Sequence, residues 1–328
     1  GGKGTRLMPL TQKLPKPLMP VLTKPVISYI IQLLLNYNIN DIAITLMHMP
    51  EMIVSEVNKQ FSINFNYFIE QKPLGTAGSV RAVKDWLNKN PFIVISGDAL
   101  TNLDLSKLYD AHLKSNADIT MAVKEVQNPS LYGVVKTDNN GYVTNFIEKP
   151  QNDEIISNLI NCGIYIINPD ILSYIPKGTM FDFAKDLFPI ILKKGKKIFT
   201  HKIKKYWCDI GCIEEYFKAN MDMLNGENDL DFFTKDMQEL YDIALRRTYF
   251  GRRSFVGLKV DIGDNVIIGN NCHIDGNISL SDCIIFDNTY LDVSCHGVIA
   301  TPDHYIPVLY RQSSISPEEQ TYTAINNS

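Results

Sequence analysis

Residues 1–21 read GGKGTRLMPLTQKLPKPLMPV, and this opening stretch joins a glycine-rich turn to basic side chains. Glycines at positions 1, 2 and 4 let the backbone approach a bound group, and successive N–H groups in such a turn form an anion cradle. Arg6 adds a planar guanidinium suited to phosphate oxygens, and Lys16 adds a point charge between two prolines. Because such a turn normally follows a strand, we expect further residues, and a strand, ahead of Gly1.

The next part of the chain alternates between helix-like and strand-like segments. Residues 26–38 are apolar on all sides and predict a buried helix, whereas the β-branched run at 41–47 predicts a strand. Residues 92–98, FIVISGD, form a short apolar run of the kind expected in a strand covered on both faces. This alternation predicts an α/β domain with a Rossmann-like, mostly parallel sheet, whose ligands bind beyond the carboxyl ends of the strands. Residues 132–150 depart from it and predict a hairpin around Asp138.

A different pattern starts at residue 260, where VDIGDN, VIIGNN, CHIDGN, ISLSDC, IIFDNT and YLDVSC repeat every six residues. Apolar residues occupy the first and third positions of each repeat through Ile284 and Phe286. Such repeats predict a short left-handed parallel β-helix with each apolar pair in its interior. We therefore divide the chain into a domain at 1–226, a linker at 227–256, the β-helix at 257–295 and an irregular tail at 296–328. A stack this short has open ends, which a homo-oligomer through the β-helix would cover.

The composition narrows the class of protein. A formal net charge of -4 gives no concentrated basic surface, which argues against nucleic-acid binding. No apolar run approaches the ~18 residues of a membrane span, so we expect no membrane association. The six cysteines have neither zinc-site spacing nor disulfide density, which predicts reduced thiols and a cytoplasmic protein.

The opening stretch resembles the signature of sugar-1-phosphate nucleotidyltransferases, G-G-x-G-T-R-L-x-P-L-T followed by P-K-P-L-x-P-V. It does not match the Walker pattern, because no GK[ST] follows at the required spacing. The resemblance implies that Lys16 neutralises the α-phosphate under attack. It also implies that the triphosphate is held by Gly1, Gly2, Gly4, Thr5 and Arg6.

Further matches to the same family continue in order to about residue 225. PLGTAGSV at 73–80 looks like the nucleoside-binding loop and implies contacts from Gly75 and Thr76, although it also reads simply as a turn before a helix near Ser79. IEKP resembles the E-K-P element, which implies sugar-phosphate contacts by Glu148 and Lys149. NCG at 161–163 matches N-x-G, which implies sugar contacts by Asn161 and Gly163.

Two aspartates complete the implied site. Asp98 ends the FIVISGD segment at the expected rim of the sheet, and WCDIG supplies Asp209, the second carboxylate of the family. The resemblance implies that the two carboxylates share one Mg²⁺, which favours carboxylate, water and phosphate oxygens. Either aspartate taken alone would also suit an ordinary surface or turn position.

The implied reaction is nucleotidyl transfer from an NTP to a sugar 1-phosphate, giving a nucleotide-sugar and pyrophosphate. FDFAKDLFPIIL and YWCDIG look most like the mannose-1-phosphate guanylyltransferase branch, which favours GTP and mannose 1-phosphate. Thymidylyl, uridylyl or adenylyl transfer to glucose 1-phosphate shares nearly every motif. A non-catalytic regulatory subunit that binds nucleotide-sugars is the alternative of another class, but such subunits typically lose the residues retained here at positions 6, 16, 98 and 209.

Overall fold

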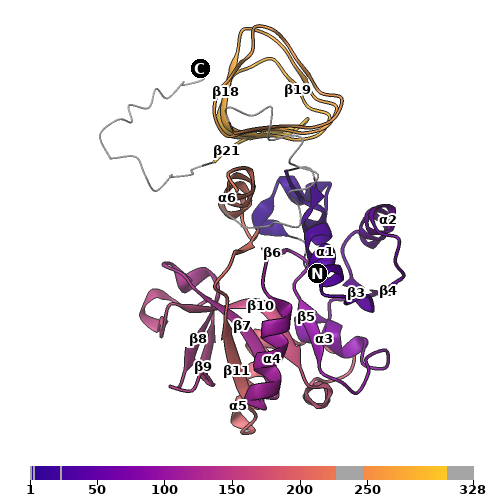
Figure 1. The fold of residues 1–328 in the computed structure, drawn as a ribbon, viewed down its shortest axis with the longest axis vertical. Coiled ribbons are helices and arrows are strands. Elements are labelled where there is room, and N and C mark those ends of the chain that lie inside the picture. Colours follow the sequence, from indigo (N-terminus) through magenta and orange to yellow (C-terminus); the bar gives the residue numbers. More distant parts are fainter. Residues whose placement is uncertain (1, 3, 23, 227–246, 309–328) are drawn as a thin grey trace.

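The computed structural model describes residues 2, 4–22, 24–226 and 247–308. They form an α/β unit and, beyond it, a stack of short strands that Figure 1 shows end-on as a rounded triangle. The helices of the larger unit are α1 (Val26–Asn36), α2 (Pro50–Gln60), α3 (Gly75–Ala82), α4 (Leu105–Ser115), α5 (Phe188–Lys193) and α6 (Ile213–Leu224). Its strands are β1 (Pro20–Val21), β2 (Lys24–Pro25), β3 (Ile42–Leu46), β4 (Phe65–Ile69), β5 (Phe92–Ile95), β6 (Ala99–Thr101), β7 (Ile119–Glu125), β8 (Gly133–Thr137), β9 (Val143–Glu148), β10 (Leu159–Ile167), β11 (Ile198–Lys202) and β12 (Trp207–Asp209).

The central sheet is mixed rather than mostly parallel. Its order is β11-β7-β10-β8-β9, and β5 also pairs with β10. Strands β7 and β11 run parallel, as predicted, but β10 is antiparallel to β5, β7 and β8. Because β8 is antiparallel to both β9 and β10, these two strands run the same way on either side of it, opposite to β5, β7, β8 and β11. The prediction of a mostly parallel sheet is therefore wrong at β10.

The predicted hairpin is confirmed between β8 and β9. Asp138 Oδ1 accepts hydrogen bonds from the backbone N–H groups of Asn140 and Tyr142, each at 2.9 Å. Gly141 closes the turn at a φ of 87°, in the left-handed region that glycine adopts without strain.

Strands β3 and β4 form a separate parallel pair beside the central sheet. Their register runs from Ile42 opposite Phe65 to Leu46 opposite Ile69. Helices α1 and α2 cover this pair through a small apolar core that contains Ile31, Leu46, Ile53 and Val57. The predicted buried helix at 26–38 is thus confirmed as α1, which buries residues on nearly all its sides.

The second unit consists of parallel strands that stack on one another. Thr248 pairs with Val266, 18 residues further on, and Val266 pairs with Cys283 after 17 residues. Leu280 pairs with Cys295 after only 15 residues. The strands are β13 (Thr248–Phe250), β14 (Phe255–Val256), β15 (Asp261–Ile262), β16 (Val266–Ile268), β17 (His273–Ile274), β18 (Ser279–Ile285), β19 (Tyr290–Leu291), β20 (Cys295–Ala300) and β21 (Tyr305–Pro307).

The shortened coils correct two predictions about this unit. The first four apolar pairs of the repeat do line its interior, but Ile284 and Phe286 face outward, and Cys283 and Ile285 take the inner positions. A one-residue shift moves every side chain of a strand to the opposite face, and here the shift follows Asp282, whose φ is 45°. The stack also extends from Thr248 to Ala300, beyond the predicted limits of 257 and 295, and antiparallel β21 follows it within the predicted tail.

The outward-facing residues of the stack pack against the larger unit. The rings of Tyr216, on α6, and Phe286 lie 6.2 Å apart between centroids, and Ile284 belongs to the same apolar core as Tyr29 of α1. Lys13 Nζ also forms an ion pair with Asp303 Oδ2 at 2.6 Å. A side of the stack, rather than one of its ends, is therefore the face that touches the α/β unit (Figure 1). Within the described ranges, no helix has the length and apolar character needed to cross a membrane.

Candidate active site

The glycine turn at the start of the chain is held in a tight conformation. Gly4 has a φ of 64°, and a Cβ added there would lie 3.2 Å from Thr11 Cγ2 and 3.4 Å from Lys16 Cβ. The buried Thr11 hydroxyl donates a hydrogen bond to the Gly4 carbonyl at 2.8 Å. Gly2, Thr5 and Arg6 are exposed beside it, whereas Gly1 lies outside the described residues. The turn therefore needs glycine at position 4 and leaves neighbouring groups open to a ligand.

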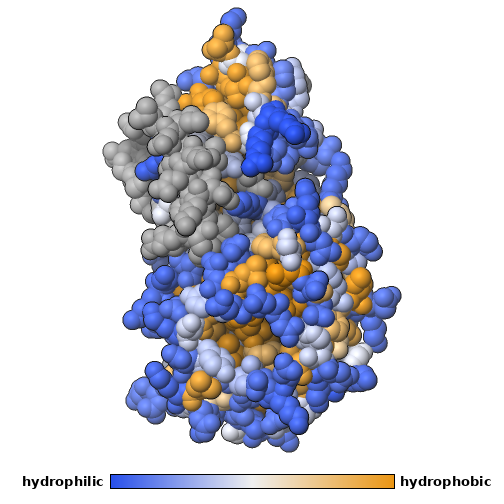
Figure 2. Space-filling view, turned by 45° about the vertical axis from the view of Figure 1, so that its right-hand side comes forward, coloured by the Kyte–Doolittle hydropathy of each residue, from blue (hydrophilic) through white to orange (hydrophobic). Residues whose placement is uncertain are grey.

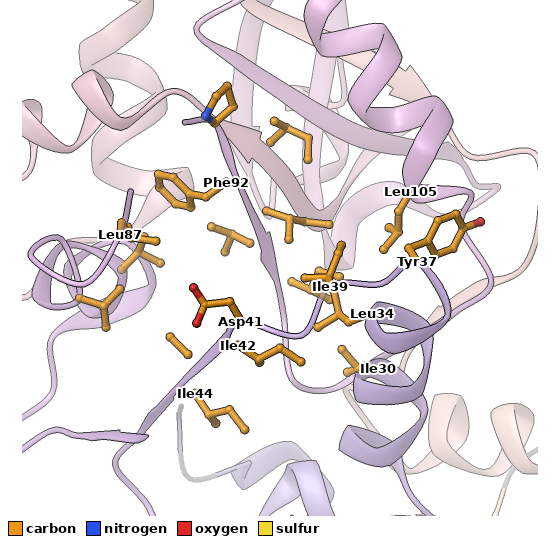
Figure 3. Close-up of a pocket in the computed structure, with 18 of the residues that line it drawn as sticks. Ile30, Leu34, Tyr37, Ile39, Asp41, Ile42, Ile44, Leu87, Phe92 and Leu105 are labelled. Carbon is orange, nitrogen blue, oxygen red and sulfur yellow. The ribbon is translucent and has the colours of Figure 1, made fainter. Parts of the chain in front are cut away.

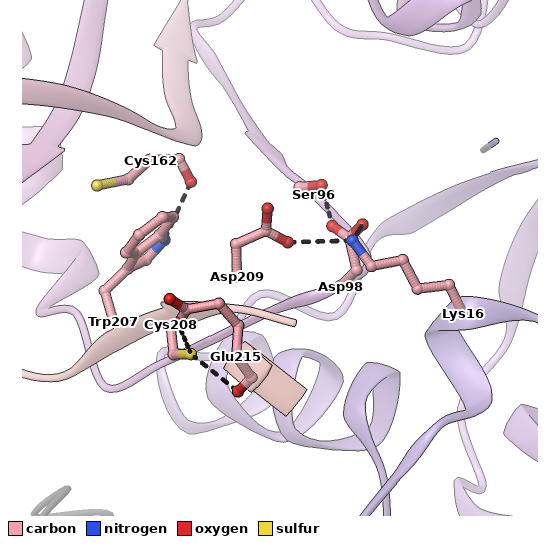
Figure 4. A network of polar contacts seen from close by, with 8 residues as sticks. All are labelled: Lys16, Ser96, Asp98, Cys162, Trp207, Cys208, Asp209 and Glu215. Carbon is pink, nitrogen blue, oxygen red and sulfur yellow. Dashed lines mark hydrogen bonds and ion pairs between the residues drawn. The ribbon is translucent and has the colours of Figure 1, made fainter. Parts of the chain in front are cut away.

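Lys16, Asp98 and Asp209 converge on one point (Figure 4). Lys16 Nζ lies 2.6 Å from Asp98 Oδ2 and 3.1 Å from Asp209 Oδ1. Asp98 follows β5, and Asp209 pairs with Ala99 across the antiparallel β12–β6 ladder, which brings the two carboxylates together across more than 100 residues of sequence. The exposed fractions of the three side chains are only 13%, 25% and 26%.

The electrostatics of this cluster leave negative charge uncompensated. Burial by itself opposes the charge of Lys16, but Asp98 and then Asp209 outweigh it and raise the pKa of Lys16. Burial likewise opposes the charge of Asp98, yet the Lys16 ammonium prevails and lowers the pKa of that carboxyl. Burial and the Asp98 charge together raise the pKa of Asp209. One ammonium thus serves two partly buried carboxylates, and the pKa of the second, Asp209, remains raised.

Three further groups lie around this cluster. Ser96 donates a hydrogen bond to Asp98 Oδ1, and the backbone N–H of Ser96 donates to the Gly163 carbonyl at 3.1 Å. Arg6 Nη2 lies 3.3 Å from the position of a Cβ built on Gly211, and its charge partly offsets the raised pKa of Asp209. The structure thus brings the glycine turn, both aspartates and the NCG segment to one place.

The NCG segment is a bulge in β10. The pairing register of β10 with β7 shifts between Asn161 and Tyr165, and Gly163 within the bulge has a φ of 70°. Asn161 Oδ1 accepts the Gly163 N–H at 3.0 Å, and Asn161 Nδ2 donates to the Tyr165 hydroxyl at 2.8 Å. The Asn161 side chain therefore shapes the bulge.

Glu148 lies at the end of β9, next to Lys149. A Cβ built on Gly133 would lie 2.8 Å from Glu148 Oε2, so the glycine makes room for this carboxylate. Burial raises the pKa of Glu148, and the charges of Lys149 and Arg6 oppose that rise. Lys149 is exposed and has a φ of 49°. Glu148 is thus within electrostatic reach of the glycine turn.

Gly75 and Thr76 open helix α3, which begins four residues earlier than the predicted start near Ser79. Gly75 has a φ of 70°, and a Cβ there would lie 2.6 Å from the Phe181 carbonyl oxygen. The Thr76 hydroxyl donates to Asp182 Oδ2 at 2.8 Å and accepts the Phe183 N–H at 3.0 Å. These bonds join the loop to residues 181–183. The Thr76 hydroxyl therefore forms its hydrogen bonds within the protein.

Two residues that position this site were not among the predicted ones. Thr11 fixes the turn through Gly4, and Ser96 fixes Asp98. Ser96 stands two residues before Asp98 in the FIVISGD segment, so the sequence gives a local signal for it. Thr11 lies in the stretch PLT, where nothing in the residue type alone distinguishes a buried bond to glycine from an ordinary loop hydroxyl.

Comparison with known proteins gives a consistent result. The nucleotidyl transferase family model matches residues 1–226. A UTP–glucose-1-phosphate uridylyltransferase from Synechocystis sp. is 35% identical over 69% of this chain and 62% of that protein. A mannose-1-phosphate guanyltransferase from Saccharomyces cerevisiae is 33% identical over 69% of this chain and 63% of that protein. The chain therefore spans a little over three fifths of the length of these relatives.

Solved structures agree with the family match. HddC from Yersinia pseudotuberculosis, complexed with GMP-PN, is 28% identical with a TM-score of 0.59, over 68% of this chain and 96% of that chain. A putative glucose-1-phosphate thymidylyltransferase from Bacillus anthracis is 25% identical with a TM-score of 0.60, over 67% of this chain and 91% of that chain. The chain belongs to the sugar-1-phosphate nucleotidyltransferase family.

Proposed function

We propose that this chain transfers a nucleotidyl group from an NTP to a sugar 1-phosphate, with GTP and mannose 1-phosphate as its preferred substrates. The convergence of Lys16 with Asp98 and Asp209 beside the glycine turn is the observation that carries this proposal. Several curated relatives named mannose-1-phosphate guanyltransferases, at 32 to 35% identity, favour the choice of base and sugar.

The chemistry suits the charges of the site. In the proposed reaction a phosphate oxygen of the sugar 1-phosphate attacks the α-phosphorus of the NTP, and the bond from that phosphorus to the bridging oxygen of pyrophosphate breaks. The nucleophile is already an anion, so no general base is required. The main barrier is repulsion between anions, which Arg6 and Lys16 would offset on the nucleotide side and Lys149 on the sugar-phosphate side.

The two aspartates fit a divalent cation such as Mg²⁺. Both carboxylates are largely buried, they face the same point, and together they carry more negative charge than Lys16 neutralises. No cluster of three or more His, Cys, Asp or Glu side chains suited to a metal occurs in the described part of the chain. Mg²⁺ commonly completes two carboxylates with water and substrate phosphate oxygens, so Asp98 and Asp209 would hold it together with the nucleotide. Such an ion supplies charge stabilisation to the transferring phosphoryl group.

The sugar side of the proposed pocket would be formed by the end of β9 and the bulge in β10. Glu148 has acceptor oxygens for sugar hydroxyls, and Lys149, which is exposed, has an ammonium for the phosphate. Both ends of the Asn161 amide form hydrogen bonds within the bulge. We therefore assign Asn161 to positioning Gly163 rather than to a direct sugar contact. On the nucleotide side, the backbone around Gly75 remains the candidate for the base, since the Thr76 hydroxyl is engaged by Asp182.

The second unit would support the first. The hexapeptide period and the parallel ladders favour a left-handed β-helix, and we propose that copies of the chain associate through it. Sedimentation of the purified chain at several concentrations tests this association. A monomer at every concentration would contradict it without touching the catalytic proposal.

The substrate proposal is tested by release of pyrophosphate from each of four NTPs, paired with mannose 1-phosphate or glucose 1-phosphate. We expect the highest kcat/KM for GTP with mannose 1-phosphate. A preference for UTP or dTTP with glucose 1-phosphate would overturn the choice of substrates but keep the reaction class. Tight binding of a nucleotide-sugar with no release of pyrophosphate in any pairing would instead support a regulatory subunit.

A further inference from the structure

The side chain of Trp207 joins the strand that carries Asp209 to the bulge in β10. Trp207 and Asp209 lie two residues apart in β12, which is fixed by its pairing with β6. The indole Nε1–H of Trp207 donates a hydrogen bond to the Cys162 carbonyl, within the bulge, at 3.1 Å (Figure 4). Both residues are buried, with exposed fractions of 7% and 2%. Because a buried carbonyl is unfavourable without a donor, this bond constrains the shape of the bulge.

The segment that carries the other aspartate is joined to the same bulge through its backbone. Ser96, two residues before Asp98, donates its N–H to the Gly163 carbonyl at 3.1 Å. Cys162 and Gly163 are neighbours in sequence. Two successive carbonyls of the bulge therefore each accept a hydrogen bond from a segment that bears one of the two carboxylates. The place of the bulge is thus set relative to both carboxylates of the proposed cation site.

Trp207 also packs against the second segment of the sugar side. Its ring and that of Tyr132 lie 5.8 Å apart between centroids, with their planes inclined at 64°. The Tyr132 carbonyl accepts the backbone N–H of Lys149 at 3.0 Å, and the next residue, Gly133, pairs with Glu148. Trp207 therefore contacts the bulge directly and reaches the end of β9 through Tyr132.

We propose that Trp207 is a positioning residue, which holds the sugar side of the pocket at a fixed place relative to Asp98 and Asp209. This inference rests on the proposed function. The indole N–H holds the bulge and with it Gly163, while the ring supports Tyr132. Without the N–H, the sugar 1-phosphate should bind less tightly. The nucleotide side, formed by the glycine turn, should keep its affinity.

The chain offers a matched control, because it contains only one other tryptophan. Trp86 lines an apolar cavity of about 620 Å³ between β3 and β5, of which Figure 3 is a close-up. Figure 2 shows apolar residues gathered in the middle of one face of the larger unit, with hydrophilic residues around them. Trp86→Phe therefore exchanges one apolar ring for another in an apolar setting.

The test compares Trp207→Phe with Trp86→Phe. A third chain starts from Trp86→Phe and carries benzothienylalanine at position 207, where sulfur replaces the indole N–H and the shape of the ring system is kept. Hydrogen exchange of the Gly163 and Ser96 amides, followed by NMR without any ligand, reports the order of the bulge, because the Gly163 N–H bonds to Asn161 Oδ1 and the Ser96 N–H to the Gly163 carbonyl. The KM values for the sugar 1-phosphate and the NTP, and the affinity for Mn²⁺, report the parts of the site separately.

We expect both chains altered at position 207 to exchange these two amides at least tenfold faster than Trp86→Phe. The KM for the sugar 1-phosphate should rise by about tenfold, while the KM for the NTP and the Mn²⁺ affinity change by less than twofold. Unchanged amide exchange would overturn the proposal whether or not the chains are active. Equal rises in both KM values would also overturn it, because they would indicate a general loss of structure.

The benzothienylalanine chain separates the N–H from the volume of the ring. If only Trp207→Phe were altered, packing rather than the hydrogen bond would hold the bulge, and the proposal would be wrong. Absence of pyrophosphate release from every chain, the original included, would contradict the proposed function. The amide exchange, which needs no substrate, would still decide whether Trp207 holds the bulge.

Discussion

The ammonium of Lys16 lies 2.6 Å from the carboxylate of Asp98, and this short ion pair sits where the glycine turn meets the carboxyl end of β5. In the proposed reaction Lys16 contacts a phosphate, and Asp98 binds the cation. In the structure the two side chains instead bind each other. Both roles are compatible if the arriving cation takes the carboxylate oxygens and releases Lys16 toward the nucleotide. This exchange predicts an effect of Lys16 on cation binding and an effect of Lys16 on turnover.

Replacing Lys16 by Met should strengthen cation binding in the absence of nucleotide, because a competitor for the oxygens of Asp98 and Asp209 is removed. We expect the affinity for Mn²⁺, titrated by electron paramagnetic resonance, to rise by about tenfold. Lys196→Met provides the matched control, since Lys196 pairs with Asp118 at 2.9 Å in another part of the unit. An unchanged Mn²⁺ affinity in Lys16→Met would mean that the ammonium and the cation use different oxygens.

The same Lys16→Met chain should lose turnover while keeping its fold. Removal of one electrostatic group from the transferring phosphate lowers kcat by roughly 10²–10³. Pyrophosphate release measures the loss, and circular dichroism checks that the secondary structure is unchanged. Lys196→Met should turn over at close to the original rate. If Lys16→Met also kept that rate, the assignment of Lys16 to the reacting phosphate would be wrong.

Gly75→Ala should destabilise the chain more than Gly178→Ala. Both glycines have a left-handed φ, 70° and 67°, so alanine is strained at either position. Only at Gly75 would the new Cβ also collide with backbone, 2.6 Å from the Phe181 oxygen, whereas nothing lies within 4 Å of a Cβ at Gly178. We expect about 1 kcal/mol for Gly178→Ala and at least twice that for Gly75→Ala, measured by urea unfolding. Equal losses would show that the loop relaxes around the added methyl group.

Phe286→Ala tests the contact between the stack and the larger unit. Its ring packs near that of Tyr216, and truncation should lower the free energy of unfolding by roughly 1–3 kcal/mol. Leu258, which is fully exposed on the same unit, serves as the control, and Leu258→Ala should change stability by less than about 0.5 kcal/mol. Comparable effects of the two substitutions would contradict the outward, docked position of Phe286.

His112 should make stability depend on pH. It is buried, it bonds Thr120 at 2.9 Å and Asn168 at 3.1 Å, and burial lowers the pKa of its imidazole while the Asn168 bond partly opposes this. The unfolded chain therefore binds a proton more readily than the folded chain, at a pKa of about 6.5. The contribution to stability is complete above that value and is lost as pH falls through it. Urea unfolding at pH 7.5 and 5.5 should show a smaller difference in His112→Gln than in the original chain.

Much of this molecule follows from local patterns. The glycine turn, the hairpin at Asp138 and helix α1 each depend on neighbouring residues, so their sequences predict them well. The proximity of Asp98 and Asp209 cannot be predicted from local patterns, because it depends on the register of β12 against β6. The direction of β10 and the outward turn of Phe286 were mispredicted for a related reason. The first is decided by pairing with strands distant in sequence, and the second by the length of a coil, rather than by the residues themselves.

The way the larger unit rests on the stack bears on how such chains can change over evolution. The docking face uses Ile267, Ile284 and Ile299 from three successive levels of one side, and Tyr249 and Ile306 from the strands at its two ends also pack there. Loss of a level at either end would therefore remove apolar contacts to the larger unit. The height of the stack is thus tied to the surface of the unit that it touches.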